Sequence, residues 1–167
     1  MMTVRTIHPS DEAAYLGILG RMSSADRYFR FFRAVDHFEH VDVARFVDPG
    51  PDMLALIAES DGRPVGAAHA FITGTSGELA VIVAPDARRA GVASALLGHL
   101  GAMLRARRVK TLSAFSLTDN YAFAKLARRS GMQPSHAAGD GSVVTWTLAL
   151  DPPAAEEQSG NPPILAA

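Results

Sequence analysis

The feature that most constrains the fold is the stretch ELAVIVAPDARRAGVASALLGHLGAML, which runs from Glu78 to Leu104. It opens as an apolar, β-rich run, continues through a loop from Ala84 to Ala90, and then places apolar residues at helical spacing. A strand that leads directly into a helix with an apolar face requires other layers against which both elements are buried. The stretch therefore predicts a sheet covered by helices.

Two local signals define further elements. Asp61-Gly62 predicts a two-residue hairpin turn between two β-rich runs. Ser23 followed by Asp26 resembles a capping box and predicts the start of a short helix, while Ser10 is expected to cap the helix before it. The expected order is strand 3–7, helices 8–22, 23–32 and 40–48, strands 53–60, 63–73 and 78–83, helix 91–108, strand 110–117, helix 119–131, and a turn and strand within 139–150.

The length of 167 residues fits one domain with one full core. The order of elements predicts that residues 1–150 form a single mixed α/β domain with a central sheet and helices on its faces. From residue 151 the chain is rich in proline and shows no periodicity. Residues 151–167 are therefore expected to be a largely disordered tail.

Composition excludes several kinds of site. The sequence has no cysteine, which excludes a disulfide framework, a thiolate nucleophile and a cysteine-ligated zinc site. The net charge of -1 gives no global attraction to nucleic acid or to an anionic membrane. His37 and His40 lack a zincin-like pattern around them, so no metal site is expected. Because we find no signal-peptide pattern and no apolar run that could span a bilayer, we expect a cytoplasmic protein.

The turn between the strand and the helix of the opening stretch has the composition of an anion site. A helix begins with backbone N–H groups that have no partner inside the helix, and its dipole adds positive charge there. Gly91 allows close approach to the backbone, Ala90 and Ala93 are small, and Arg88 and Arg89 add charge. An ordinary tight turn would use the same residues. The chain has neither a P-loop nor a G-x-G-x-x-G motif, which excludes those two phosphate loops.

These residues also carry a family resemblance. RRAGVA, at 88–93, resembles the acetyl-CoA signature Q/R-x-x-G-x-G/A of the GNAT acetyltransferases; AVIVAP before it and NYAFAKLARRSGM downstream are similar to that family's fourth strand and second cofactor motif. The resemblance covers about Thr3 to Leu150. It implies an α/β (α+β) acyl-CoA N-acyltransferase fold with a central mixed, mostly antiparallel sheet and helices on both faces. It further implies acetyl-CoA as co-substrate, bound at Val81, Ile82, Val83, Arg88, Arg89, Ala90, Gly91, Val92, Ala93, Ser94, Asn120 and Tyr121.

A narrower resemblance is to the catalytic domain of Pat-type bacterial protein lysine acetyltransferases. MSSADRYFRFF is similar to their Tyr-x-Arg-Phe-Phe segment, and ELAVIV is similar to a strand whose Glu is the general base. The resemblance implies direct acetyl transfer to a protein lysine with Glu78 as the base. A base is needed because a lysine ammonium, with a pKa of about 10.4, is almost fully protonated at neutral pH. Many GNAT enzymes carry a Tyr acid for the leaving thiolate where this chain has Ala127, a departure that fits the Pat-like branch.

Alternatives remain open for this site. Glu78 could lie at a solvated strand edge, and the acceptor could be a small amine such as a polyamine, an amino acid or an antibiotic. A non-catalytic module that binds acetyl-CoA would carry the same cofactor motifs. The chain is expected to be a monomer or a homodimer. Tyr28, Phe29, Phe31 and Phe32 are expected mostly in the core, with Arg30 near the acceptor or a carboxylate.

Overall fold

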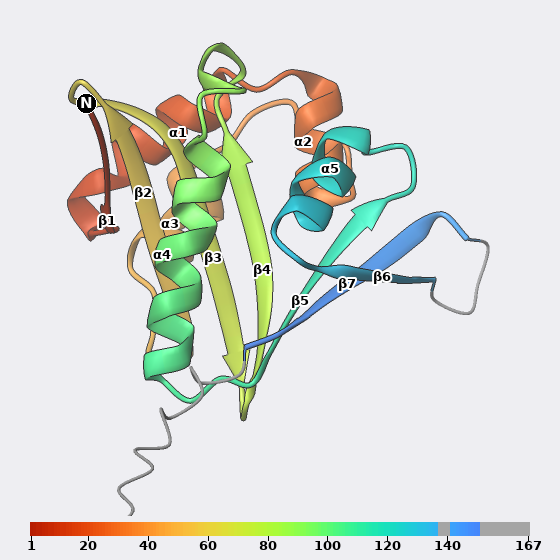
Figure 1. The fold of residues 1–167 in the computed structure, drawn as a ribbon. Coiled ribbons are helices and arrows are strands. Elements are labelled where there is room, and N and C mark those ends of the chain that lie inside the picture. Colours follow the sequence, from red (N-terminus) through yellow and green to blue (C-terminus); the bar gives the residue numbers. More distant parts are fainter. Residues whose placement is uncertain (137–140, 151–167) are drawn as a thin grey trace, which may run out of the picture.

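The computed structural model describes residues 1–136 and 141–150, and the tail expected at 151–167 lies outside the described residues (Figure 1). The strands of the described part are β1 (Met2–Thr6), β2 (Met53–Ser60), β3 (Arg63–Thr73), β4 (Ser76–Val83), β5 (Thr111–Leu117), β6 (Gln133–His136) and β7 (Val143–Ala149). The helices are α1 (Glu12–Gly20), α2 (Ser24–Phe31), α3 (His40–Val47), α4 (Val92–Ala106) and α5 (Tyr121–Arg129), with 3₁₀ turns η1 (Pro9–Asp11) and η2 (Pro85–Ala87).

The strands form one seven-stranded sheet in the order β1-β2-β3-β4-β5-β7-β6. Neighbouring strands are antiparallel except β4 and β5, which are parallel. β4 pairs with β5 only from Ser76 to Leu79, whereas it pairs with β3 along its whole length to Val83. Beyond Leu79 the two parallel strands separate, and Figure 1 shows the sheet opening into two arms there. We call this point the fork.

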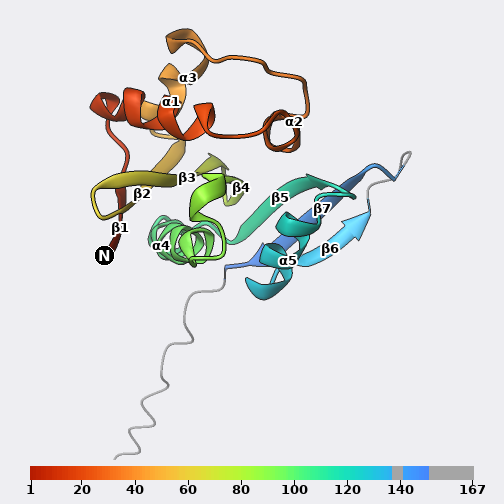
Figure 2. The ribbon, with the colours of Figure 1, turned by 90° about the horizontal axis from the view of Figure 1, so that it is seen from above.

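Helices cover both faces of the sheet, as Figure 2 shows from above. On one face, α1 and α3 pack over alternate residues of the central strands, such as Ala55, Ile57 and Ala67. On the other face, α4 packs over the intervening residues, such as Leu56 and Ala68. This alternation follows from the period of two along a strand, and it makes both faces apolar. The expected mixed sheet with helices on both faces is confirmed.

Local sequence signals account for several boundaries. Asp61 and Gly62 both have positive φ, 51° and 77°, as the tight turn between β2 and β3 requires. At the start of α2, the Asp26 N–H donates to Ser23 Oγ at 3.1 Å, and the Ser23 N–H donates to Asp26 Oδ2 at 3.1 Å. The expected hairpin and capping box are therefore both present.

Two expectations about elements are wrong. Ser10 does not cap the first helix, because residues 9–11 form the 3₁₀ turn η1 and Asp11 accepts the His8 N–H at 2.8 Å instead. The short strand β6 was not expected, since it has four residues and contains Pro134. Proline is tolerated there because β6 lies at the sheet edge and pairs with β7 alone.

Gly66 lets α4 approach the sheet at the end of β4. A Cβ on Gly66 would lie 2.9 Å from the Ile82 carbonyl oxygen and 2.9 Å from Val92 Cγ1. Both distances are shorter than any ordinary contact of a Cβ atom. The missing side chain therefore sets how closely the first turn of α4 packs against β3 and β4.

Candidate functional site

The loop between β4 and α4 presents unpaired backbone N–H groups at the surface. Arg89 and Gly91 have φ of 62° and 81°, which turn the backbone sharply before the helix begins. In the described structure, the N–H groups of residues 89–94 donate to no backbone carbonyl, and α4 has no side-chain N-cap. The side chains of residues 88–91 and 94 are exposed. Such a loop at a helix N-terminus can receive an anion.

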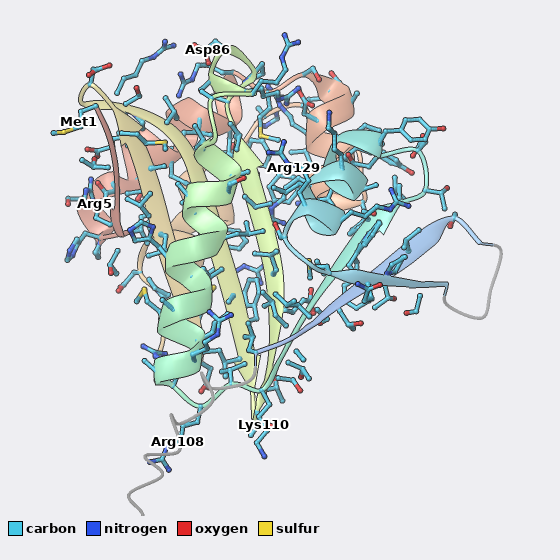
Figure 3. All side chains as sticks on the ribbon, in the orientation of Figure 1. Met1, Arg5, Asp86, Arg108, Lys110 and Arg129 are labelled. Carbon is cyan, nitrogen blue, oxygen red and sulfur yellow. The ribbon has the colours of Figure 1, made fainter. Side chains whose placement is uncertain are left out.

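Ion pairs fix this loop to the surrounding elements. Asp86 pairs with Arg63 at 2.7 Å and with Arg21 at 3.4 Å, and Figure 3 places Asp86 at the end of the sheet opposite Arg108 and Lys110. Arg88 Nη2 pairs with Asp26 Oδ1 of α2 at 2.7 Å. The sequence did not suggest these pairs, because each joins segments far apart in the chain.

Asp26 is an ionised carboxylate, and it holds Arg88 in place. Burial alone would raise the pKa of Asp26, but hydrogen bonds from Ser23 and Arg88 lower it below its ordinary value. Arg89, by contrast, has no ion pair among the described residues. The loop thus carries one cation already matched to a carboxylate and one that is not.

The open edge of β4 lies directly below this loop. Ala80 to Val83 pair with β3 on one side and with no strand on the β5 side. The Ile82 side chain is buried under α1 and α3, while Val81 and Val83 pack against the core on the α4 side. Any ligand at this edge would therefore meet the backbone of Val81, Ile82 and Val83 more than their side chains.

Asn120 and Tyr121 lie at the same end of the sheet as the loop, because β4 and β5 are parallel and each is followed by one of these segments. Asn120 is the N-cap of α5, where its Oδ1 accepts the Phe123 N–H at 3.1 Å. Tyr121 is 77% exposed. Ala127 is buried on the inner side of α5, so this position does not reach the open edge.

Glu78 lies on β4 within the last paired stretch before the fork, opposite Phe71 of β3 and Ser113 of β5. Its side chain is exposed and lines a cavity of about 410 Å³ together with Ala80, two residues further along the same face. Residues of α2, of the segment between α2 and α3, of α3 and of β3 form the rest of the wall. Of the predicted site residues, Glu78 is the one that reaches this cavity.

The cavity wall also contains arginines whose closeness to one another was not predicted from the sequence. Arg30, Arg33 and Arg45 line it together with Glu78. The Arg30 guanidinium stacks over the rings of Phe31 and Phe46, at 4.8 and 5.7 Å from the ring centroids, and Arg45 stacks over Phe46 at 4.6 Å. The Tyr-x-Arg-Phe-Phe segment indicated Arg30, but nothing in the sequence linked Arg45 to it.

A buried aromatic cluster supports this wall from below. His69 is 1% exposed and lies between the rings of Tyr15 and Phe46, at 5.4 and 5.0 Å. Burial, and then the positive charge of Arg30, lower the pKa of His69 to about 3, although a hydrogen bond to the Phe46 carbonyl acts in the opposite direction. His69 is therefore neutral at physiological pH and has no access to a ligand.

The expectation that the aromatic residues of α2 lie mostly in the core is wrong. No residue of α2 is buried, and Tyr28 and Phe32 are 46% and 44% exposed. Phe31 and Phe32 line the cavity instead. α2 contacts β4 and β5 at the fork, where no continuous sheet lies beneath it to cover an apolar face.

Two further features are absent from the described residues. No group of three His, Asp or Glu side chains there is arranged to hold a metal ion. No helix in the same part of the chain is long and apolar enough to cross a membrane.

Comparison with known proteins defines the class. The model of the acetyltransferase (GNAT) family matches residues 22–132, more than half of the chain. The loop and the forked parallel pair both lie within that match. The chain therefore belongs to the GNAT acetyltransferase family, and the expected N-acetyltransferase class is confirmed.

Solved structures agree with this assignment. The GNAT domain of PAT from S. lividans is 26% identical with a TM-score of 0.80, over 87% of this chain and 89% of that one. The ribosomal-protein-S18-alanine N-acetyltransferase of Escherichia coli is 22% identical with a TM-score of 0.70, over 94% and 98%. The PaiA N-acetyltransferase of Thermoplasma acidophilum, solved with coenzyme A, is 12% identical with a TM-score of 0.75, over 89% and 99%. The expected fold is confirmed, as is acetyl-CoA as the co-substrate typical of the family.

Proposed function

We propose that this protein transfers the acetyl group of acetyl-CoA directly to the side-chain amine of a protein lysine, with Glu78 as general base. The observation that carries the proposal is the position of Glu78. Its carboxylate lines a cavity at the fork, beside the edge of β4 that no strand covers. An acceptor in the cavity and a thioester along the open edge would meet at this point.

Acetyl-CoA binds, in this proposal, along the loop and the open edge. The N–H groups of Arg89, Ala90, Gly91, Val92, Ala93 and Ser94, which have no backbone acceptor among the described residues, receive the diphosphate, and the Arg88 side chain adds positive charge beside them. The backbone of residues 81–83 pairs with the amide-rich pantetheine arm as an added strand would. Asn120 and Tyr121 contact the cofactor from the α5 side.

The reaction needs no enzyme nucleophile. Glu78 accepts a proton from the acceptor ammonium, and the neutral nitrogen attacks the thioester carbonyl carbon. The C–N bond forms as the C–S bond breaks, and N–H groups of β4 polarise the carbonyl oxygen. As it becomes an amide, the nitrogen loses its second proton to water, and the leaving thiolate takes a proton from water or from Tyr121, because position 127 holds a buried alanine.

Exposed aromatic side chains favour a protein as the acceptor over a small amine. Tyr28 on α2, Phe32 at the end of α2, Phe115 on β5 and Tyr121 on α5 are all exposed, and these elements surround the fork. Exposed aromatic residues gathered around one site are typical of protein-binding surfaces. The narrower resemblance to Pat-type enzymes supports the same acceptor.

The test is thiol release from acetyl-CoA with a panel of proteins, lysine peptides and small amines, in wild type and Glu78→Gln. Loss of a general base typically lowers the rate by about 10² to 10⁴. Because the fraction of neutral amine rises with pH, we expect the defect of Glu78→Gln to shrink between pH 7 and 10. Calorimetry with coenzyme A should give the same affinity for both proteins.

A matched control is Glu59→Gln, which removes a carboxylate on β2 that pairs with Arg5, away from the cavity. This variant should keep full activity. Unchanged turnover in Glu78→Gln would remove Glu78 from its role, and coenzyme A binding without turnover on any amine would leave a non-catalytic module. Faster turnover of small amines than of any peptide would favour the small-molecule alternative.

Three expectations from the sequence stay predictions. They are a cytoplasmic location, a single domain over residues 1–150, and a monomeric or homodimeric state.

A further inference from the structure

The cavity at Glu78 has an excess of positive charge. Of the described residues that line it, three are arginines, Arg30, Arg33 and Arg45, and one is a carboxylate, Glu78. An acceptor that offered only an ammonium would meet one attractive group and three repulsive ones. A cavity of this kind suits an acceptor that brings negative charge as well as an amine.

Among the side chains that the structure describes, none of the three arginines is paired with an acid. Among the described side chains, no carboxylate lies within ion-pairing distance of Arg30, Arg33 or Arg45. By contrast, Arg5, Arg21, Arg63 and Arg88 each pair with Asp or Glu. Each arginine that lines the cavity therefore lacks an ion pair with a described side chain.

Arg30 is the most constrained of the three. Its Nε and Nη2 are buried without a hydrogen-bond partner, and aromatic rings on two elements hold the guanidinium in place. Burial lowers the pKa of Arg30, and the charge of Arg45 lowers it further, while Tyr15 and Glu78 raise it. A largely buried guanidinium without a paired carboxylate is unfavourable, and a carboxylate bound on the cavity side of Arg30 would supply the missing negative charge.

We propose that the acceptor lysine is flanked by an Asp or Glu whose carboxylate binds Arg30, with Arg33 and Arg45 nearby, while the lysine amine faces Glu78. This inference rests on the proposed function and adds the sequence context of the acceptor. The carboxylate of the acceptor at Arg30 and its lysine amine at Glu78 then lie in one cavity. Arg30 is in this view a specificity-determining residue and takes no part in proton transfer.

The test compares three peptides that differ only beside the target lysine, which is followed by Glu, Gln or Arg. With wild type, we expect kcat/KM for the Glu peptide to exceed that of the Gln peptide by about tenfold to hundredfold, the range that a hydrogen-bonded charge pair supports. The Arg peptide should be the poorest. The advantage of the Glu peptide should fall as salt is raised.

Substitution of Arg30 should remove this preference. In Arg30→Gln, the Glu and Gln peptides should react at similar rates, and Arg30→Lys should restore part of the difference, because it returns the charge without the planar fork. Arg108→Gln is the control, since Arg108 is exposed in the turn between α4 and β5 at the far end of the sheet (Figure 3). It should keep the wild-type ranking.

The outcomes separate the inference from the proposed function. Equal rates with all three peptides in wild type would overturn the inference and leave the function standing, whereas no turnover on any amine would overturn the function. Faster acetylation of free amino acids than of the Glu peptide would mean that the carboxylate belongs to a small substrate, which also overturns the peptide assignment. Because the peptide series needs only wild type, the inference stays testable even if Arg30→Gln fails to fold.

Discussion

His69 should make the stability of the protein fall between pH 7 and pH 5. Its pKa is about 3 in the folded protein, first because the ring is buried and then because Arg30 and Arg45 are close. In the unfolded chain it returns to about 6.5. Between these values the unfolded chain binds one more proton at this position, so folding is favoured less as pH falls.

The size of the effect follows from the two pKa values. Between pH 6.5 and 3, each pH unit lowers the free energy of unfolding by about 1.4 kcal/mol at this one site. From pH 7 to pH 5 the expected loss is about 2 kcal/mol. The contribution of His69 is complete above pH 6.5.

The assay is urea unfolding of wild type and His69→Phe at pH 7, 6 and 5. Phe keeps an aromatic ring between Tyr15 and Phe46 and removes the titrating group. His69→Phe should lower stability at pH 7, because the Phe46 carbonyl loses its partner. It should nevertheless lose about 2 kcal/mol less than wild type between pH 7 and 5. Equal losses in the two proteins would refute the reasoning, because they would mean that His69 has an ordinary pKa or is not buried.

Two further predictions concern the loop and the fork. Gly66→Ala should destabilise the protein by about 1 to 3 kcal/mol, measured by urea unfolding, because its Cβ would lie 2.9 Å from Ile82 O and from Val92 Cγ1. It should also weaken coenzyme A binding in calorimetry, since both contacts lie beside the proposed cofactor edge; unchanged affinity would show that the start of α4 does not need this close approach. Asp26→Asn should tighten coenzyme A binding by releasing Arg88, at a stability loss of about 1 kcal/mol or less for the altered cap. Weaker binding would mean that the ion pair positions Arg88 for the cofactor.

Short-range signals were the ones that sequence reasoning could use. The Asp61-Gly62 turn, the Ser23 cap and the strand–loop–helix order around Gly91 each depend on residues close together in the chain, and the structure has all three. β6 was missed because its pairing with β7 depends on tertiary context, which also makes Pro134 acceptable at the edge. In these cases, the prediction is confirmed where the interacting residues are close in the sequence, and it fails where they are far apart.

The candidate site was predicted in part. The position of Glu78 on its strand followed from the sequence, but the cavity did not, because α2, α3, β3 and β4 all contribute to its wall. The aromatic residues at 28–32 were assigned to the core by their composition, but at the fork Tyr28 and Phe32 are exposed and Phe31 is only partly buried. Which cations gather around Glu78 is decided by packing between segments that no spacing rule connects.

One consequence follows from the ion pair between Asp26 and Arg88. α2 is a single helix of eight residues, and it carries Asp26 in its first turn and Arg30 one turn later. A diphosphate that drew Arg88 toward itself would compete with Asp26 for that side chain. It would thereby weaken the ion pair that holds α2, which forms part of the cavity wall. We therefore expect the thioester and the acceptor to weaken each other's binding through α2, by the same factor in both directions.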